Sequence, residues 1–120
     1  MTDGRVTGIG GVFFRAKDSD ALAAWYKEHL DVPSWGPWAQ EEGHSVFAPF
    51  KHDTDYWPDD KAWMLNLRVA GLDALVARLE RSGIAVERRE EWDAEGYGRF
   101  ARIHDPEGTP IELWEPPERT

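Results

Sequence analysis

The stretch Asp-Pro-Glu-Gly-Thr-Pro-Ile-Glu-Leu-Trp-Glu (residues 105–115) joins a turn to a strand. Its first four residues favour a turn, because proline fixes φ at a turn corner and glycine adopts a positive φ at low cost. Apolar and polar residues then alternate, which is the period of a half-buried strand. On such a strand Ile111 and Leu113 face one side, while Glu112 and Trp114 face the other. If the two aliphatic residues enter the core, Glu112 lies on the open face as a ligand, a base or a solvated charge.

Length and composition restrict the class of protein. The chain has 120 residues, enough for a single domain with its own core. Its formal net charge of −9 argues against nucleic acid or an anionic membrane as partner, because phosphate binding needs a basic face. No window approaches the roughly 18 apolar residues of a membrane span. The sequence has no cysteine and no apolar signal-peptide core, so we expect a cytoplasmic protein without disulfides.

Strands and helices are expected to follow one another along the chain, which is the pattern of an α+β domain. One helix carries Leu22, Trp25, Tyr26 and Leu30 at helical spacing, after an N-cap at Asp18 or Ser19. A second helix carries Leu72, Leu75, Val76 and Leu79 and ends near Gly83. The expected strands cover residues 9–16, 35–40, 44–50, 63–69, 84–91 and 99–104, and the one after the turn at 105–108.

The two halves of the chain repeat one another at an offset of 53 residues. Asp-Ala-Leu occurs at residues 20–22 and again at 73–75, and Arg15 and Phe14 align with Arg68 and Leu67. Two amphipathic helices can resemble each other by chance, but here the flanking strands align in the same frame. The repeat predicts two strand–helix–strand units, whose helices lie on one side and whose sheets curl around a shared cleft.

At this level of detail the sequence resembles the vicinal oxygen chelate superfamily of glyoxalases, bleomycin-resistance proteins and extradiol dioxygenases. The resemblance covers nearly the whole chain and implies two paired βαβββ modules that form one domain with a concave mixed sheet. Module one would span about residues 7–50, a linker 51–61, and module two about 62–116. The residues that carry the resemblance are Ile-Gly-Gly-Val-Phe-Phe-Arg-Ala-Lys-Asp (9–18), Trp-Tyr-Lys-Glu-His-Leu (25–30), Met-Leu-Asn-Leu-Arg-Val (64–69), Leu-Asp-Ala-Leu (72–75) and Asp-Pro-Glu-Gly-x-x-Ile-Glu-Leu (105–113).

The resemblance also implies a divalent metal site, with a histidine from the first strand of each module and a glutamate from the last. By position these histidines fall on Gly11 and Met64, whereas the glutamate of module two is present as Glu112. The remaining ligand would lie in residues 44–50, which contain no carboxylate. Glycine has no donor and a thioether is a poor ligand for hard cations. We therefore predict no cofactor, and a divalent metal is the alternative.

Other side chains are candidates for a ligand site in the cleft. Arg15 and Arg68 are related by the repeat, and with Arg102 they are possible partners of Glu112 or of an anionic ligand. The histidines His44, His52 and His104 are read as surface or turn residues, and His29 as a cation at a helix C-terminus. The predicted site has Glu112 as the one catalytic candidate, and its ligand-binding residues are Phe13, Arg15, Phe47, Met64, Asn66, Arg68, Arg102 and Trp114.

Three functions follow from these residues and the resemblance. The first is a binding protein that holds a small aromatic or antibiotic-like molecule in the cleft without the usual metal chelate. The second is an enzyme, a glyoxalase-type lyase or a dioxygenase, that uses Glu112 in a rearranged metal site or in acid–base chemistry. The third is an interaction module with no small ligand. In each case we expect a homodimer, because the sheet leaves edges that a partner can cover.

Overall fold

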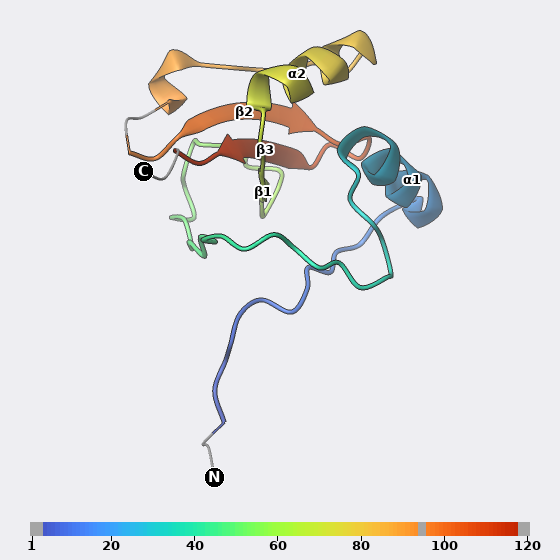
Figure 1. The fold of residues 1–120 in the computed structure, drawn as a ribbon, viewed down its shortest axis with the longest axis vertical. Coiled ribbons are helices and arrows are strands. Elements are labelled where there is room, and N and C mark those ends of the chain that lie inside the picture. The colour runs from blue at the N-terminus through green and yellow to red at the C-terminus, as the bar shows by residue number, and fades with distance from the viewer. Residues whose placement is uncertain (1–3, 94–95, 118–120) are drawn as a thin grey trace.

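The computed structural model describes residues 4–93 and 96–117, which form an α+β fold around a mixed sheet (Figure 1). Strand β3 is central, parallel to β1 on one side and antiparallel to β2 on the other. The predicted α+β class is confirmed. No helix within 4–93 or 96–117 is long and apolar enough to span a bilayer. The elements are α1 (Ser19–Leu30), β1 (Leu65–Arg68), α2 (Leu72–Arg81), the 3-10 helix η1 (Glu90–Trp92), β2 (Arg99–His104) and β3 (Pro110–Glu115).

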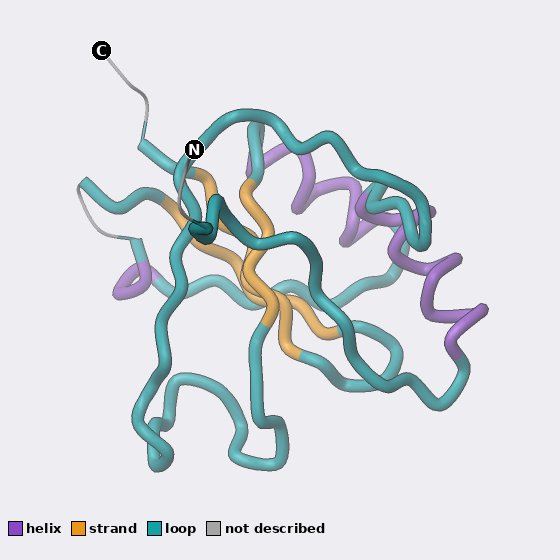
Figure 2. The backbone as a smooth tube through the Cα atoms, turned by 90° about the horizontal axis from the view of Figure 1, so that it is seen from below, coloured by secondary structure: helices purple, strands orange, loops and turns teal. Residues whose placement is uncertain are grey.

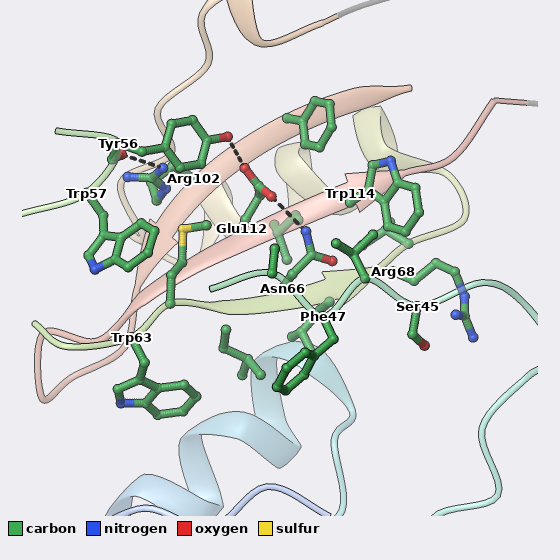
Figure 3. Close-up of a pocket in the computed structure, with 18 of the residues that line it drawn as sticks. Ser45, Phe47, Tyr56, Trp57, Trp63, Asn66, Arg68, Arg102, Glu112 and Trp114 are labelled. Carbon is green, nitrogen blue, oxygen red and sulfur yellow. Dashed lines mark hydrogen bonds between the residues drawn. The ribbon is translucent and has the colours of Figure 1, made fainter. Parts of the chain in front are cut away.

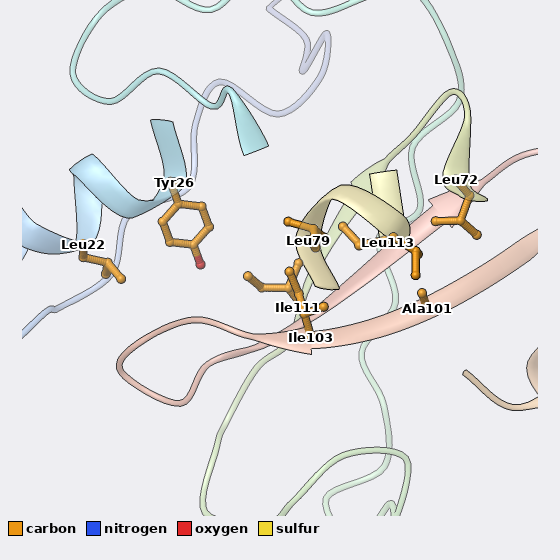
Figure 4. Packing of buried hydrophobic residues seen from close by; sticks show 9 residues of the cluster. Leu22, Tyr26, Leu72, Leu79, Ala101, Ile103, Ile111 and Leu113 are labelled. Carbon is orange, nitrogen blue, oxygen red and sulfur yellow. The ribbon is translucent and has the colours of Figure 1, made fainter. Parts of the chain in front are cut away.

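The core lies between the sheet and the two helices, and its centre is β3 (Figure 4). Ile111 and Leu113 are fully buried beneath α2, so the expected facing of this strand is correct. Each such aliphatic side chain contributes about 1.5–3 kcal/mol on burial, which fixes the opposite face of β3 outward from the core. The remaining core residues are Leu22, Tyr26, Leu72, Val76, Leu79, Ala101 and Ile103.

Helix α2 begins on a carboxylate supplied by β3. Its N-cap Gly71 has φ 75° and provides no side chain for the exposed N–H groups of the first turn. The Oε2 of Glu115 accepts from the backbone N–H of Gly71 at 2.9 Å and of Leu72 at 3.2 Å. An anion at this end of a helix also interacts favourably with the helix dipole. The last residue of β3 therefore sets where α2 starts.

Helix α1 is attached to the turn that precedes β3. The expected cap is confirmed, because Asp18 accepts from the Ala21 N–H at 3.1 Å. From the turn, Glu107 accepts from the backbone N–H groups of Asp18 and Lys17, which lower the pKa of its carboxyl. The Tyr26 hydroxyl reaches the buried Asp105 carboxylate at 2.7 Å. The stretch at 105–115 thus contacts the N-terminal end of both helices.

The two helices begin 53 residues apart, in the frame of the sequence repeat. The strands of the first half do not follow that repeat. Residues 9–16, 35–40 and 44–50 were expected as strands but run as extended loop, and in Figure 2 this loop tube passes over the strands on the side away from the helices. Phe13 and Phe47 are 90% and 87% exposed.

Strand formation depends on pairing with a partner strand as much as on alternation, and within the described residues these segments pair with no strand of the sheet. Alternation alone therefore overestimated the sheet. The strand expected at 84–91 is similarly reduced to a single bridge, in which Glu87 and Arg102 exchange two backbone hydrogen bonds of 2.8 Å. The second half keeps the order strand, helix, bridge, strand, strand.

Truncation of Leu113 should destabilise the fold. Leu113 is 0% exposed in the centre of β3, so Leu113→Ala leaves a cavity and should lower the free energy of unfolding by about 2–5 kcal/mol. Chemical denaturation measures the loss. The control is Val6→Ala, an aliphatic truncation at an exposed position, which should change stability by less than about 0.5 kcal/mol. Equal, small effects of the two variants would mean that β3 does not form the core.

Candidate functional site

The face of the sheet opposite to α2 carries three polar side chains in one row. Asn66 on β1 is the Cα partner of Glu112 on β3, and Glu112 is the partner of Arg102 on β2. Residues directly across from one another on paired strands project from the same face. Figure 3 shows these three side chains together over the sheet. We call Asn66, Glu112 and Arg102 the polar row.

Glu112 is buried, and both of its carboxylate oxygens accept hydrogen bonds. Asn66 donates its side-chain N–H to Oε1 at 2.7 Å. The hydroxyl of Tyr56 donates to Oε2 (Figure 3). Charge-assisted hydrogen bonds of this kind hold a carboxylate in one orientation. The sequence led us to expect an arginine partner for Glu112, but its partners are a phenol and an amide.

Arg102 is 4% exposed and lies among aromatic rings. Its guanidinium carbon is 5.2 Å from the centre of the Tyr56 ring and 5.1 Å from that of Trp92, both within cation–π range. Its Nη2 donates to the backbone carbonyl of Tyr56 at 3.1 Å. Its Nε is buried without a partner among the described residues, which is a costly arrangement for a charged group.

An open pocket lies over the polar row, and the loops before β1 form its other side. Phe13 and Arg15, which the sequence placed in this site, lie outside it on the exposed N-terminal segment. Arg68 is held by the loop, donating to the backbone carbonyls of His44 at 2.9 Å and Glu41 at 2.5 Å. The other predicted site residues do line the pocket: Phe47, Met64, Asn66, Arg68, Arg102, Glu112 and Trp114.

The sequence reading missed the aromatic side chains that surround the polar row. Tyr56 and Trp57 come from residues 51–61, which were expected to be only a linker, and Trp92 comes from η1. Phe50 packs on Tyr56 with ring centres 5.7 Å apart and on Trp57 at 5.0 Å. Two adjacent aromatic residues in an otherwise polar segment were the available signal. All four aromatic residues line the pocket.

The pocket does not fit the metal centre that the resemblance implies. Both oxygens of Glu112 accept hydrogen bonds, and the nearest charged group in the row is the cation Arg102. Met64 lines the pocket with a thioether, and Gly11 offers no side chain. Within residues 4–93 and 96–117 no three His, Cys, Asp or Glu side chains lie close enough to hold an ion.

Comparison with known proteins gives the family. The model of the glyoxalase-like domain matches residues 11–114, nearly the whole chain. The chain belongs to the glyoxalase-like domain family. The resemblance to the vicinal oxygen chelate superfamily is thereby confirmed, and the match includes the polar row and the loop with Tyr56.

Two solved structures from Streptomyces sp. CB03234 are similar to this glyoxalase-like domain. One is TnmS3, an antibiotic binding protein, at 26% identity and a TM-score of 0.52, with 84% of this chain and 88% of that chain covered. The other is a glyoxalase/bleomycin resistance protein at 38% identity and a TM-score of 0.36, covering 42% and 41% of the two chains. A search of curated proteins gave no match.

The pH dependence of stability should report the Tyr56–Glu112 contact. Burial, and then donation to Glu112, raise the pKa of Tyr56 from 10.0 to about 12. A folded-state pKa above the unfolded one means that this contribution is complete below pH 10.0 and disappears as the pH rises towards about 12. Burial and Asp105 raise the pKa of Tyr26 as well, so wild type alone does not isolate Tyr56.

The measurement is the free energy of unfolding from about pH 9 to about pH 11.5 in wild type and in Tyr56→Phe. We expect the variant to lose less stability over this range, because one of the two perturbed phenols is absent. Parallel curves for the two proteins would show that Tyr56 titrates alike in the folded and unfolded chain.

Proposed function

We propose that this glyoxalase-like domain binds a small aromatic molecule in the pocket over the polar row, without a metal chelate. The observation that carries the proposal is the polar row itself: a fixed carboxylate beside a buried guanidinium, surrounded by aromatic side chains. Small-molecule sites combine apolar walls with a few well-placed polar groups. The antibiotic binding activity stated for TnmS3 supports the same class of function.

Binding should depend on the aromatic wall of the pocket. Trp114 lines it from β3, whereas Trp35 is 96% exposed and lies outside it. In a thermal-shift screen of small aromatic compounds, we expect hits on wild type whose affinity falls about tenfold or more in Trp114→Ala, equivalent to about 1.4 kcal/mol. Trp35→Ala removes the same side chain and should bind as wild type does. A screen without hits, or hits that survive Trp114→Ala, would reject the site.

The enzyme alternative, a lyase or dioxygenase using Glu112, depends on a metal or on proton transfer. The hydrogen-bonded Glu112 and its cationic neighbour favour binding over metal chemistry. We predict that calorimetric titration with Zn²⁺, Ni²⁺, Mn²⁺ and Fe²⁺ gives no stoichiometric site tighter than about micromolar, since three or four donors are needed. A tight site that is lost in Glu112→Gln would restore the metal-dependent enzyme.

We further propose that the domain acts as a homodimer in the cytoplasm, with its first module at residues 7–50 and its second at 62–116. The support for a dimer is that large apolar side chains on the extended segments, among them Phe13, Val46 and Phe47, are each exposed. A second copy would remove such side chains from water. We predict a dimer mass by light scattering at micromolar concentration, and a monomer mass would contradict it.

A further inference from the structure

The polar row already holds an aromatic ring that belongs to the protein. Tyr56 donates its hydroxyl to Glu112, and its ring lies against the guanidinium of Arg102. The ring of Trp92 meets that of Tyr56 edge to face, with the two ring centres 6.3 Å apart. Tyr56 therefore fills the position in which the proposed ligand would make its best contacts (Figure 3).

The two sides of this contact differ in how firmly they are held. Asn66, Glu112 and Arg102 project from three paired strands whose other face is the core. Tyr56 projects from residues 51–61, which contain neither helix nor strand. Its backbone N–H donates to Thr54 Oγ1 at 3.2 Å, its backbone carbonyl accepts from Arg102 Nη2 at 3.1 Å, and Trp57 Nε1 donates to the Lys61 carbonyl at 2.8 Å. The row therefore projects from paired strands, whereas the Tyr56 side chain comes from an irregular loop, the class of segment that rearranges at the lowest cost.

We infer that the ligand of this pocket is a phenol, and that it binds by displacing Tyr56 from the polar row. The inference rests on the proposed binding function and specifies its ligand class. A phenol gives its proton to the fixed carboxylate and presents an electron-rich ring to the guanidinium. An aromatic compound without the hydroxyl would leave a buried carboxylate oxygen without its donor, which is unfavourable.

The displacement has a consequence for affinity. A ligand that must first remove an occupant binds with its intrinsic affinity reduced by the fraction of molecules in which the site is free. If Tyr56 occupies the row in about nine of ten molecules, its removal should tighten binding about tenfold. In wild type, the hydrogen bond to Glu112 is exchanged rather than gained, because Tyr56 gives up the same bond. The contribution of Glu112 is therefore measured by comparing a phenol with an aryl ether, because both must displace the same Tyr56 bond and only the phenol replaces it.

The probe is p-cresol, which is the side chain of tyrosine as a free molecule, compared with 4-methylanisole, whose oxygen cannot donate. Their affinities are measured by ¹H–¹⁵N NMR titration, following the indole N–H signals. We expect Tyr56→Ala to bind p-cresol about tenfold tighter than wild type does. In both proteins p-cresol should bind more tightly than 4-methylanisole, by about tenfold in Tyr56→Ala. Tyr56→Phe keeps the ring without the donor, so its affinity for p-cresol should lie between those of wild type and Tyr56→Ala.

Two controls separate the phenol from other causes. His52→Ala changes an exposed residue of the same loop that lines the open pocket but makes no hydrogen bond to the polar row, and this variant should bind p-cresol as wild type does. The double variant Tyr56→Ala with Glu112→Gln should lose most of the preference for p-cresol over 4-methylanisole, because the acceptor is no longer charged.

Equal affinity for p-cresol and 4-methylanisole in Tyr56→Ala overturns the phenol assignment. Equal affinity of wild type and Tyr56→Ala for p-cresol, or tightening in His52→Ala as well, overturns the displacement of Tyr56. If either result is obtained while Trp114→Ala still weakens the binding of aromatic compounds, the proposed function stands. An absence of any aromatic hit in wild type and variants would remove the proposed function itself.

Discussion

The hydrogen bond from Tyr26 to the Asp105 carboxylate connects the first half of the chain to the sheet. Asp105 is buried, and its other oxygen accepts from the backbone N–H of Glu107 at 2.8 Å and of Thr109 at 3.0 Å. A buried carboxylate is tolerated only when its acceptors are satisfied, so the turn and helix α1 each depend on the other. Loss of this contact would leave one oxygen of a buried carboxylate without its donor and remove one of the links between α1 and the turn before β3.

The turn and strand β3 together fix where both helices begin. Glu107 lies before the strand and accepts from Lys17 and Asp18 at the start of α1, whereas Glu115 ends the strand and accepts from Gly71 and Leu72 at the start of α2. Both helices are thus positioned by carboxylates on either side of one six-residue strand. With its inner face filled by Ile111 and Leu113, that strand holds Glu112 rigidly in the open face. The strand that positions the two helices is therefore also the strand that places Glu112 in the site.

How far the sequence predicted this structure depends on whether the information is local. Turn residues at 105–108, helical spacing and the alternation in β3 predicted both helices, three strands and the facing of Glu112 correctly. Strand pairing in the first half depends on which edge is available, and the sequence does not state this. Tyr56 was likewise missed as a partner of Glu112, because it is 56 residues away in the chain, whereas Asn66 was among the predicted site residues.

Arg102 shows where stability and function compete on this sheet. Its side chain is 4% exposed, its Nε has no partner among the described residues, and the neighbouring carboxylate is bonded to Tyr56 and Asn66 instead. An aliphatic residue between the rings of Tyr56 and Trp92 would avoid the cost of burying a charge. A position that breaks the local rules of a stable core is a strong indication of a functional site. The buried Nε of Arg102 thus supports, from energetics, the same pocket that the hydrogen bonds of Glu112 define from geometry.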